Sequence, residues 1–513
     1  MSDISENNKR IAKNTIFLYI RLLLAMGVGI YTSRIILSAL GQEDFGLYSV
    51  VGSIVVMFYF LNNSMSGATS RFLTFELGRK DYERLKKTFS AALTIHIFIA
   101  LIVVIIGETI GLWYLETKLV IPDGRLFAAR WVYHLSLLSA VITITQVPYS
   151  ASIIAHEKMD VYAYIEIIKT LLQLGIVFLL LLGDSDRLIL YAVLMVSVSL
   201  ITTLLYRWYC INRFQECKYK FHTDKSIINP MLSFSGWNLY SDLAFQAQGN
   251  GINVILNLFF GTIVNAAYGI GLQLSRAVYS FISNFTMAVK PQIIKYYSIG
   301  QVREMESLMN SSTRYSFLML FALAMPVILE TDFLLSVWLK NPPEFSGLFC
   351  QLSLVMMMLN VFWINLKHAT HATNNIRLAS IIIGTLFLSI PVISYLILKQ
   401  GAKQVYIPMV IAISMYAFII TARLLIVKKL IPQISILRYI KNVILLSVIT
   451  ACVGSILPLS IYLYMSEGWY RLISVSAAYI FSMSLATYFF GMGKEMRSKV
   501  KMFLLKKIRS CKK

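Results

Sequence analysis

Two apolar segments of the chain carry polar side chains at helical spacing. In 231–257 the polar positions recur every three or four residues, which places them on one face of a helix: Asn238, Asp242, Gln246, Asn250, Asn253 and Asn257. In 261–285 a second set falls within about 100° of arc: Asn265, Gly269, Gln273, Arg276, Ser280 and Asn284. Amides and hydroxyls hydrogen-bond to sugars, and a guanidinium group binds phosphate oxygens through forked hydrogen bonds.

Polar side chains of this kind also join neighbouring helices inside a membrane, at about 0.6 kcal/mol per hydrogen bond. One or two such residues per helix suffice for that purpose. Six in register on each segment favour a water-filled cavity over simple helix pairing.

Four cations lie deep within apolar segments: Arg21 and Arg34 in 15–37, Lys169 in 161–183, and Arg276. An ionisable side chain inside a bilayer costs roughly 2.5–3.5 kcal/mol, so it normally faces protein or water. Arg21 and Arg34 are separated by about 140° around the helix, so they cannot both point into one cavity, and Lys169 has a local ion-pair partner in Glu166. The candidate substrate-binding residues are Arg34, Arg276, Asn238, Asp242, Gln246, Asn250, Asn253, Asn265, Gln273, Arg21 and Lys169.

The remaining reactive residues do not indicate catalysis, a metal or a cofactor. His368 and His371 lie three residues apart without acidic or cysteine partners nearby, a pattern that does not predict a metal site. No GxxxxGK[ST] phosphate-binding loop occurs, so we expect no ATP hydrolysis. The five cysteines are scattered without a CxxC pair, so we expect neither a disulfide framework nor structural zinc.

The elements that position these residues are membrane-spanning helices. Of 513 residues, 57% are hydrophobic and only 14% are charged, unlike a soluble domain. Runs of spanning length predict an all-α polytopic membrane protein with fourteen helices: 15–37, 46–65, 89–113, 128–152, 161–183, 188–208, 231–257, 261–285, 313–332, 347–367, 378–398, 405–427, 441–464 and 470–490. These spans leave little chain for a large appended enzyme or receptor module.

The charge distribution predicts the orientation. The net charge of +22 would suggest nucleic acid in a soluble protein, but most of the cations fall in alternate loops, as the positive-inside rule requires. We therefore expect no nucleic-acid partner and place the cation-rich side, with both termini, in the cytoplasm. We expect the apolar run that follows the polar start to be a retained first span rather than a cleaved signal peptide. The basic tail Gly491–Lys513 predicts an amphipathic helix on anionic lipids of the inner leaflet.

The connections differ between the two sides. We expect long cytoplasmic connections at 66–88, 209–230 and 286–312, and only short ones opposite, the longest at about 114–127. Membrane glycosyltransferases, polymerases and ligases that act on lipid-linked sugars generally hold catalytic residues in a sizeable external loop. The short external connections argue against those enzymes.

The two halves of the chain repeat each other. LGQEDFGLYSVVG and FGTIVNAAYGIGL align with an offset of 220 residues, which pairs Gly41 with Gly261 and Tyr48 with Tyr268. Farther on we pair Gly78 with Gly300 and Glu83 with Glu306. The repeat predicts a lobe of six spans in 1–220, a second in 221–430, and two added spans with the basic tail in 431–513. Both lobes insert the same way up, and a cleft between two such lobes is typical of transporters.

The opening NTIFLYIRLLLAMGVGIYTSRIILSALGQEDFGLYSVVG, the stretch QVPYSASIIAHEKMDVYAYI and the segment PQIIKYYSIGQ resemble the polysaccharide transporter family. These are the Wzx-type O-antigen flippases of the multidrug/oligosaccharidyl-lipid/polysaccharide exporter superfamily. The resemblance covers nearly the whole chain and implies a MATE-like bundle of six plus six helices with two C-terminal additions.

The resemblance also implies a function and partners. It implies a bacterial inner-membrane protein, not an enzyme, that moves undecaprenyl-diphosphate-linked oligosaccharide to the periplasmic leaflet. Partners would be this substrate, anionic membrane lipids and other polysaccharide-assembly proteins. Family cavities are cationic, a property that we carry over to Arg34, Arg276 and the polar face of 231–257.

Three alternatives stay open. A cation-coupled multidrug exporter of the same superfamily would need an acidic, partly aromatic cavity, against which the arginines of the first span argue. A flippase for lipid II would work in almost the same physical way, and only the family resemblance disfavours it. A polysaccharide polymerase or ligase would need a sizeable external catalytic loop, and the sequence predicts none. Coupling to protons or sodium through Asp242 is a further hypothesis.

Overall fold

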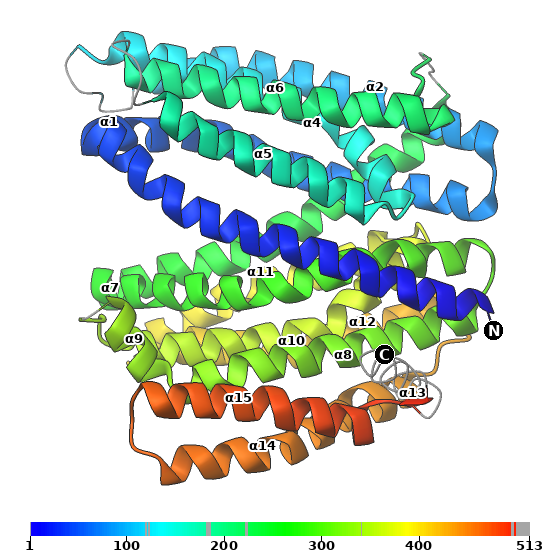
Figure 1. The fold of residues 1–513 in the computed structure, drawn as a ribbon, viewed down its shortest axis with the longest axis vertical. Coiled ribbons are helices and arrows are strands. Elements are labelled where there is room, and N and C mark those ends of the chain that lie inside the picture. The colour runs from blue at the N-terminus through cyan, green and yellow to red at the C-terminus, as the bar shows by residue number, and fades with distance from the viewer. Residues whose placement is uncertain are drawn as a thin grey trace, which may run out of the picture. The chain divides into compact units, whose positions relative to one another are not determined.

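The computed structural model describes residues 2–117, 121, 124–180, 186–220, 224–339, 341–493 and 497–498, with part of the α1 side chains outside this description. The basic tail predicted to lie on the inner leaflet falls almost wholly outside these residues. The described residues form helices and contain no strand (Figure 1). The α-helices are α1 (Ser2–Arg79), α2 (Tyr82–Ile106), α3 (Leu112–Thr117), α4 (Leu126–Ala155), α5 (Met159–Leu179), α6 (Arg187–Arg213), α7 (Lys225–Ser298), α8 (Val302–Leu329), α9 (Thr331–Leu339), α10 (Ser346–Ala372), α11 (Arg377–Lys399), α12 (Ile407–Leu430), α13 (Ile436–Tyr439), α14 (Leu446–Tyr464) and α15 (Trp469–Ala486).

Short turns of other helix types complete the bundle. The π-helices η1 (Gly107–Gly111), η3 (Ile440–Leu445) and η4 (Thr487–Gly491) continue longer helices, and η2 (Gln215–Cys217) is a 3-10 turn after α6. Within the described residues, twelve helices are long and apolar enough to cross a membrane; α7 counts once among them although it contains two predicted spans. The prediction of an all-α polytopic membrane protein is confirmed.

α1 and α7 are each broken at a single glycine. Gly41 has φ 78° and ψ 170°, and Gly261 has φ 81° and ψ −170°. Glycine alone adopts this backbone region readily, because a Cβ atom would clash with the adjoining peptide groups. Gly41 lies between the predicted spans 15–37 and 46–65, and Gly261 is the first residue of the predicted span 261–285. The two glycines are the pair that the sequence repeat aligned.

Replacing either break glycine by alanine is expected to lower the free energy of unfolding by about 1–3 kcal/mol, because the left-handed backbone becomes strained. No neighbouring atom lies within 4 Å of a Cβ built on Gly41 or Gly261, so crowding contributes nothing. Thermal unfolding of the purified variants measures this effect. Gly29→Ala and Gly249→Ala, which have equally open surroundings within helices, should be neutral or slightly stabilising. Equal melting of Gly41→Ala and Gly29→Ala would contradict the strain argument.

The helices that follow each break repeat at the same offset. α2 and α8, α4 and α10, and α6 and α12 begin 220 residues apart. The predicted pairing of Gly78 with Gly300 and of Glu83 with Glu306 is therefore wrong by two or three residues. Lys80 (φ 60°) is the counterpart of Gly300 (φ 76°), since each takes the left-handed conformation just before α2 or α8 begins.

The connections predicted to be long on the cation-rich side are largely helical. Lys80 and Asp81 alone connect α1 to α2, and α7 extends from Lys225 to Ser298. Apolar runs mark only the part of a helix inside a membrane. The polar flanks, such as YERLKK at the start of α2, contain good helix formers and continue the helices beyond it.

The chain divides into two compact units. Unit 1 comprises Met1–Tyr240 and Met287–Gly300, and unit 2 comprises Ser241–Thr286 and Gln301–Lys513. α7 therefore begins in unit 1, passes through unit 2 and returns to unit 1. These units do not coincide with the predicted lobes 1–220 and 221–430 or with a separate 431–513, so the lobe division stays a prediction.

The returning end of α7 is fixed within unit 1 at the turn between α4 and α5. The Gln292 side chain donates to the carboxylate of Glu157, which also pairs with Arg10 at 2.7 Å. Asn14 Nδ2 donates to the Glu157 carbonyl at 3.0 Å. These contacts bring α1, the α4–α5 turn and 287–300 together.

At the other end of unit 1, Arg125 joins the start of α4 to two further elements. Its Nε donates to Asp44 Oδ1 at 2.9 Å and its Nη1 to Asp186 Oδ2 at 2.6 Å. Burial opposes the charge, but the hydrogen bonds to Asp186 and Asp44 outweigh it and raise the pKa of Arg125. Asp44 of the LGQEDFG segment thus fixes the bend of α1.

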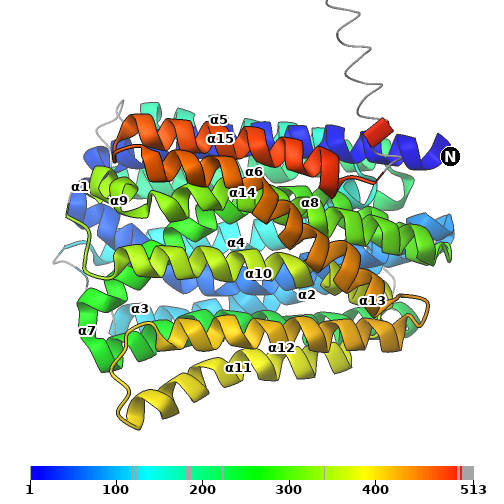
Figure 2. The ribbon, with the colours of Figure 1, turned by 90° about the horizontal axis from the view of Figure 1, so that it is seen from below.

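In unit 2, α14 and α15 run side by side and pack against α8 (Figure 2). They are the two helices predicted to lie outside the repeat. Arg471 of α15 donates two hydrogen bonds to Glu330, at 2.7 and 2.9 Å, and the Glu330 side chain has no exposed surface. The Tyr439 hydroxyl donates to the carbonyl of Phe362. These hydrogen bonds attach the two added C-terminal helices and the residues just before them to helices of the repeat.

Candidate functional site

The part of α7 inside unit 2 carries the predicted polar face. Gln246, Asn250, Gln273 and Arg276 are exposed, and Asn257 is exposed with them. A side chain exposed on a membrane helix faces either lipid or water. Amide and guanidinium groups are costly in hydrocarbon, so this face is expected to be hydrated.

α7 also has a separate apolar face. Val254 and Leu258 are each 65% exposed, and their positions are rotated by roughly 90° from the mean direction of the amides on 242–257. Aliphatic side chains exposed to this degree suit contact with lipid chains. One helix thus presents an apolar surface and a polar surface on different sides, as required where a helix borders both lipid and a water-filled space.

Two of the predicted residues hold each other across the Gly261 break. Asn265 Nδ2 donates to the Asn253 carbonyl at 2.7 Å and to Asn253 Oδ1 at 2.8 Å. Both side chains are half-buried. This pair positions the two arms of α7. The hydrogen-bonding groups that Asn253 and Asn265 use for this contact are therefore not offered to a ligand.

Asn265→Ala is expected to lower the free energy of unfolding by about 1–3 kcal/mol, because half-buried acceptors on Asn253 lose their donor. The thermal midpoint of the purified protein measures this loss. Gln273→Ala, on the same arm but exposed, serves as the control and should lie within about 0.5 kcal/mol of wild type. If both substitutions were equally silent, the Asn253–Asn265 pair would have no role in holding the break.

Arg276 is the exposed cation of this face. Among the described residues, the ion pairs of unit 2 occupy Lys367, Arg438 and Arg471 and do not include Arg276. Its five donors therefore are not committed to a described carboxylate, and a planar guanidinium is suited to two oxygens of one phosphate.

Asp242 lies in an ion pair that the sequence did not predict. Lys367 Nζ of α10 approaches Asp242 Oδ1 at 3.0 Å, and both side chains are about a quarter to a third exposed. Lys367 is the last residue of the predicted span 347–367, so the sequence alone indicated an ordinary cation at a helix end. Spacing within one helix cannot reveal a partner on another.

The other predicted residues belong to unit 1. The Arg21 guanidinium lies 5.5 Å from the ring centre of Tyr162, and Lys169 pairs with Glu166 at 3.7 Å as predicted. Asn238 is only 3% exposed. Arg34 lies on α1, but its side chain is outside the described part of the structure.

A buried cation was missed. Arg423 of α12 is 4% exposed, and its guanidinium lies 5.3 Å from the ring centre of Trp363 on α10. Both residues belong to unit 2. Arg423 lies near the end of the predicted span 405–427, where a cation normally lies at the membrane interface, so nothing in the sequence singled it out. Its aromatic partner is on another helix and can be found only from the three-dimensional structure.

A model of one protein family matches residues 11–297, which is more than half of the chain, and is described as polysaccharide biosynthesis protein. The chain belongs to this family. The family resemblance found in the sequence is thereby confirmed. None of the curated proteins compared with the chain matches it significantly.

Solved structures show the fold of this family member. A MATE crystal structure in the bent conformation is 11% identical, with a TM-score of 0.71, and covers 84% of this chain and 98% of its own. An outward-facing multidrug resistance MATE transporter of the MOP superfamily is 12% identical, with a TM-score of 0.67 and coverage of 82% and 97%. A MOP superfamily transporter from Pyrococcus furiosus, described as having a binding pocket of reverse polarity, is 13% identical, with a TM-score of 0.66 and coverage of 82% and 96%. The family member therefore has the MATE fold.

Proposed function

We propose that this family member is a flippase for undecaprenyl-diphosphate-linked oligosaccharide. It would move an O-antigen or capsule repeat unit from the cytoplasmic to the periplasmic leaflet of the bacterial inner membrane, with both termini in the cytoplasm. The observation that carries this proposal is the exposed polar face of α7, in a chain that belongs to a polysaccharide biosynthesis family.

The chemistry of the face matches the two polar parts of such a substrate. Gln246, Asn250 and Gln273 offer amide donors and acceptors for sugar hydroxyls, and Arg276 offers a fork for the diphosphate. The polyprenyl chain stays in the lipid beside the apolar face of α7. No covalent bond changes, and alternating exposure of the site to the two leaflets is the means of transport.

The membrane potential assists this direction of movement. Two diphosphate charges that leave a negative interior gain about 2.3 kcal/mol each per 100 mV. Ion coupling through Asp242 would require its carboxylate to exchange the Lys367 ammonium for the ion. We therefore propose the potential as the main driving term.

The polarity of the face separates this proposal from drug export. A site for cationic drugs needs free carboxylates, whereas Asp242 is already paired with Lys367 and Arg276 is cationic. The Pyrococcus furiosus transporter shares the fold and is described as having a binding pocket of reverse polarity. Proteins with this fold can therefore differ in the polarity of the pocket.

Transbilayer movement in liposomes tests the proposal. The purified full-length protein is reconstituted with a lipid-linked oligosaccharide on both leaflets, and an external glycosidase reports the accessible fraction. Wild-type protein should raise this fraction from about half, the value for protein-free vesicles, to nearly all, while a lipid lacking the diphosphate should stay at half. Equal fractions with and without protein would refute the flippase.

A further inference from the structure

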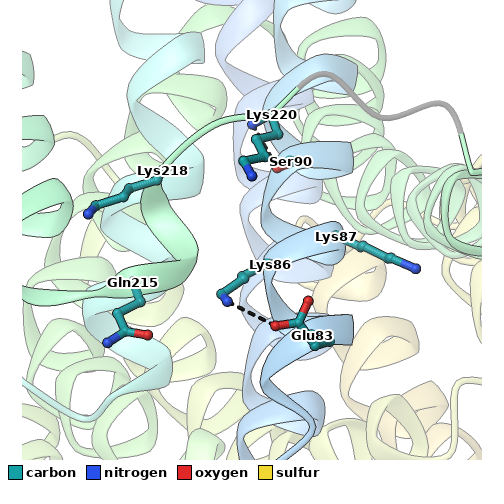
Figure 3. Close-up of a pocket in the computed structure, with 7 residues that line it drawn as sticks. All are labelled: Glu83, Lys86, Lys87, Ser90, Gln215, Lys218 and Lys220. Carbon is teal, nitrogen blue, oxygen red and sulfur yellow. Dashed lines mark hydrogen bonds and ion pairs between the residues drawn. The ribbon is translucent and has the colours of Figure 1, made fainter.

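A second cationic site lies in unit 1 and shares no residue with the polar face of α7. A cavity of about 420 Å³ opens between the start of α2 and the segment that follows α6, as Figure 3 shows. This volume is in the range of small-molecule sites, roughly 300–1,000 Å³. Its lining residues are Glu83, Lys86, Lys87, Ser90, Gln215, Lys218 and Lys220.

The lining is strongly positive. Four lysines and one carboxylate line the cavity, and Glu83 Oε1 is engaged by Lys86 Nζ at 2.9 Å, which leaves an excess of three positive charges. Lys86 and Lys220 lie between the two walls, whereas Lys87 and Lys218 extend outward on opposite sides (Figure 3). Glu216, the acid nearest in sequence to Lys218, is buried and bound to His156 at 2.5 Å. An anion between the walls would therefore meet the ammonium groups of Lys86 on α2 and of Lys220 on the facing segment, within a lining of net positive charge.

Hydrogen bonds hold the two walls in place. The backbone N–H of Lys220 donates to Ser90 Oγ at 3.3 Å, and the hydroxyls of Thr94 and Tyr219 lie 3.2 Å apart. η2 also contacts α2. The lysines of 218–220 thus have a fixed backbone position relative to α2, so the cavity is part of the fold.

The surroundings place the cavity at the level of lipid headgroups. Farther along α2, Phe98 and Leu101 are exposed apolar residues, and Leu204 on α6 is exposed in the same way. Trp208 on α6 is 67% exposed and Tyr219 is partly exposed. Exposed aliphatic side chains suit the hydrocarbon, and amphipathic aromatic rings gather at the headgroup boundary. The lysines lie just beyond that boundary, on the cation-rich side.

We propose that this cavity binds the phosphate of an anionic lipid headgroup in the inner leaflet. Ammonium groups are point charges that suit phosphate oxygens, and the adjoining apolar helix surfaces suit the acyl chains of the same lipid. A free phosphate compound shares the charge but not the chains, so the lipid binds more tightly. The site is independent of the proposed transport and holds whatever substrate the protein carries.

Native mass spectrometry of the purified full-length protein, titrated with phosphatidylglycerol or phosphatidylcholine, tests this site. Wild-type protein should bind phosphatidylglycerol about tenfold more tightly than phosphatidylcholine. Lys86→Gln combined with Lys218→Gln, which removes one charge from each wall, should weaken phosphatidylglycerol binding at least tenfold. Lys158→Gln combined with Lys225→Gln is the matched control, because both lysines are exposed in unit 1 outside the cavity.

Each outcome decides the question. The site is supported if the cavity variant loses phosphatidylglycerol binding and the control variant retains it. Wild-type binding by the cavity variant, or equal loss in both variants, would overturn it. Inorganic diphosphate serves as the soluble probe: weak competition at millimolar concentration agrees with a headgroup site, whereas tight diphosphate binding without phosphatidylglycerol binding would refute the lipid as the ligand.

Discussion

Arg276→Ala is expected to lower the rate of lipid-linked oligosaccharide translocation about 100-fold or more while the protein stays folded. Arg276 is exposed on the polar face of α7 and has no carboxylate partner among the described ion pairs. Each charge-assisted hydrogen bond to the diphosphate contributes about 1.5–3 kcal/mol, and the guanidinium supplies two at once. Removing both raises the barrier to entry of the diphosphate.

The liposome assay described above measures this rate. Arg276→Lys keeps the charge but loses the fork, so it should retain an intermediate rate. Arg303→Ala removes an exposed arginine of unit 2 from the start of α8 and should translocate like wild type. A wild-type rate for Arg276→Ala, with an unchanged melting temperature, would remove Arg276 from the substrate site.

Arg471→Ala is expected to lower the free energy of unfolding by about 3–5 kcal/mol. Glu330 is wholly buried and accepts two hydrogen bonds from Arg471, which is itself only 13% exposed. Without the guanidinium a carboxylate is left buried and uncompensated, which is the costly case for an ion pair. The loss falls where α15 attaches to the end of α8.

Thermal unfolding of purified Arg471→Ala, against wild type, provides the measurement. The double variant Glu330→Gln/Arg471→Met removes both charges at similar volume and should recover most of the lost stability. If the double variant were as unstable as Arg471→Ala, lost packing rather than an unpaired charge would explain the effect.

The parts of the fold that could be predicted are those that depend on the length of apolar segments and on glycines with a positive φ. Gly41 and Gly261 aligned in the sequence because each must adopt a conformation that other residues avoid, and the structure gives both the same φ and ψ region. Gly78 was paired wrongly with Gly300, because Lys80 takes the left-handed position without being a glycine. Helix ends were also misjudged, since polar flanks extend helices that hydropathy alone ends at the membrane.

The candidate face was predictable because amides at 3.6-residue spacing share one side of a helix. That pattern agrees with the exposure of Gln246, Asn250, Gln273 and Arg276, and their role in substrate binding stays a prediction. It cannot tell that Asn238 is buried, that Asn253 and Asn265 bond to each other, or that Lys367 pairs with Asp242. Those facts depend on neighbouring helices and turns, which spacing within one segment does not contain.

Water access to α7 tests the central claim most directly. Single cysteines replace Asn250, Gln273, Val254 or Ile263, which is an apolar residue 63% exposed on the second arm of α7, in a background where Cys452 and Cys511 are serine. The three native cysteines that remain are buried. A polar, membrane-impermeant maleimide should label positions 250 and 273 in membranes, and added lipid-linked oligosaccharide should slow this labelling, while 254 and 263 stay unreactive. Rapid labelling at 254 and 263 together with unreactive cysteines at 250 and 273 would contradict a hydrated, substrate-binding face on α7.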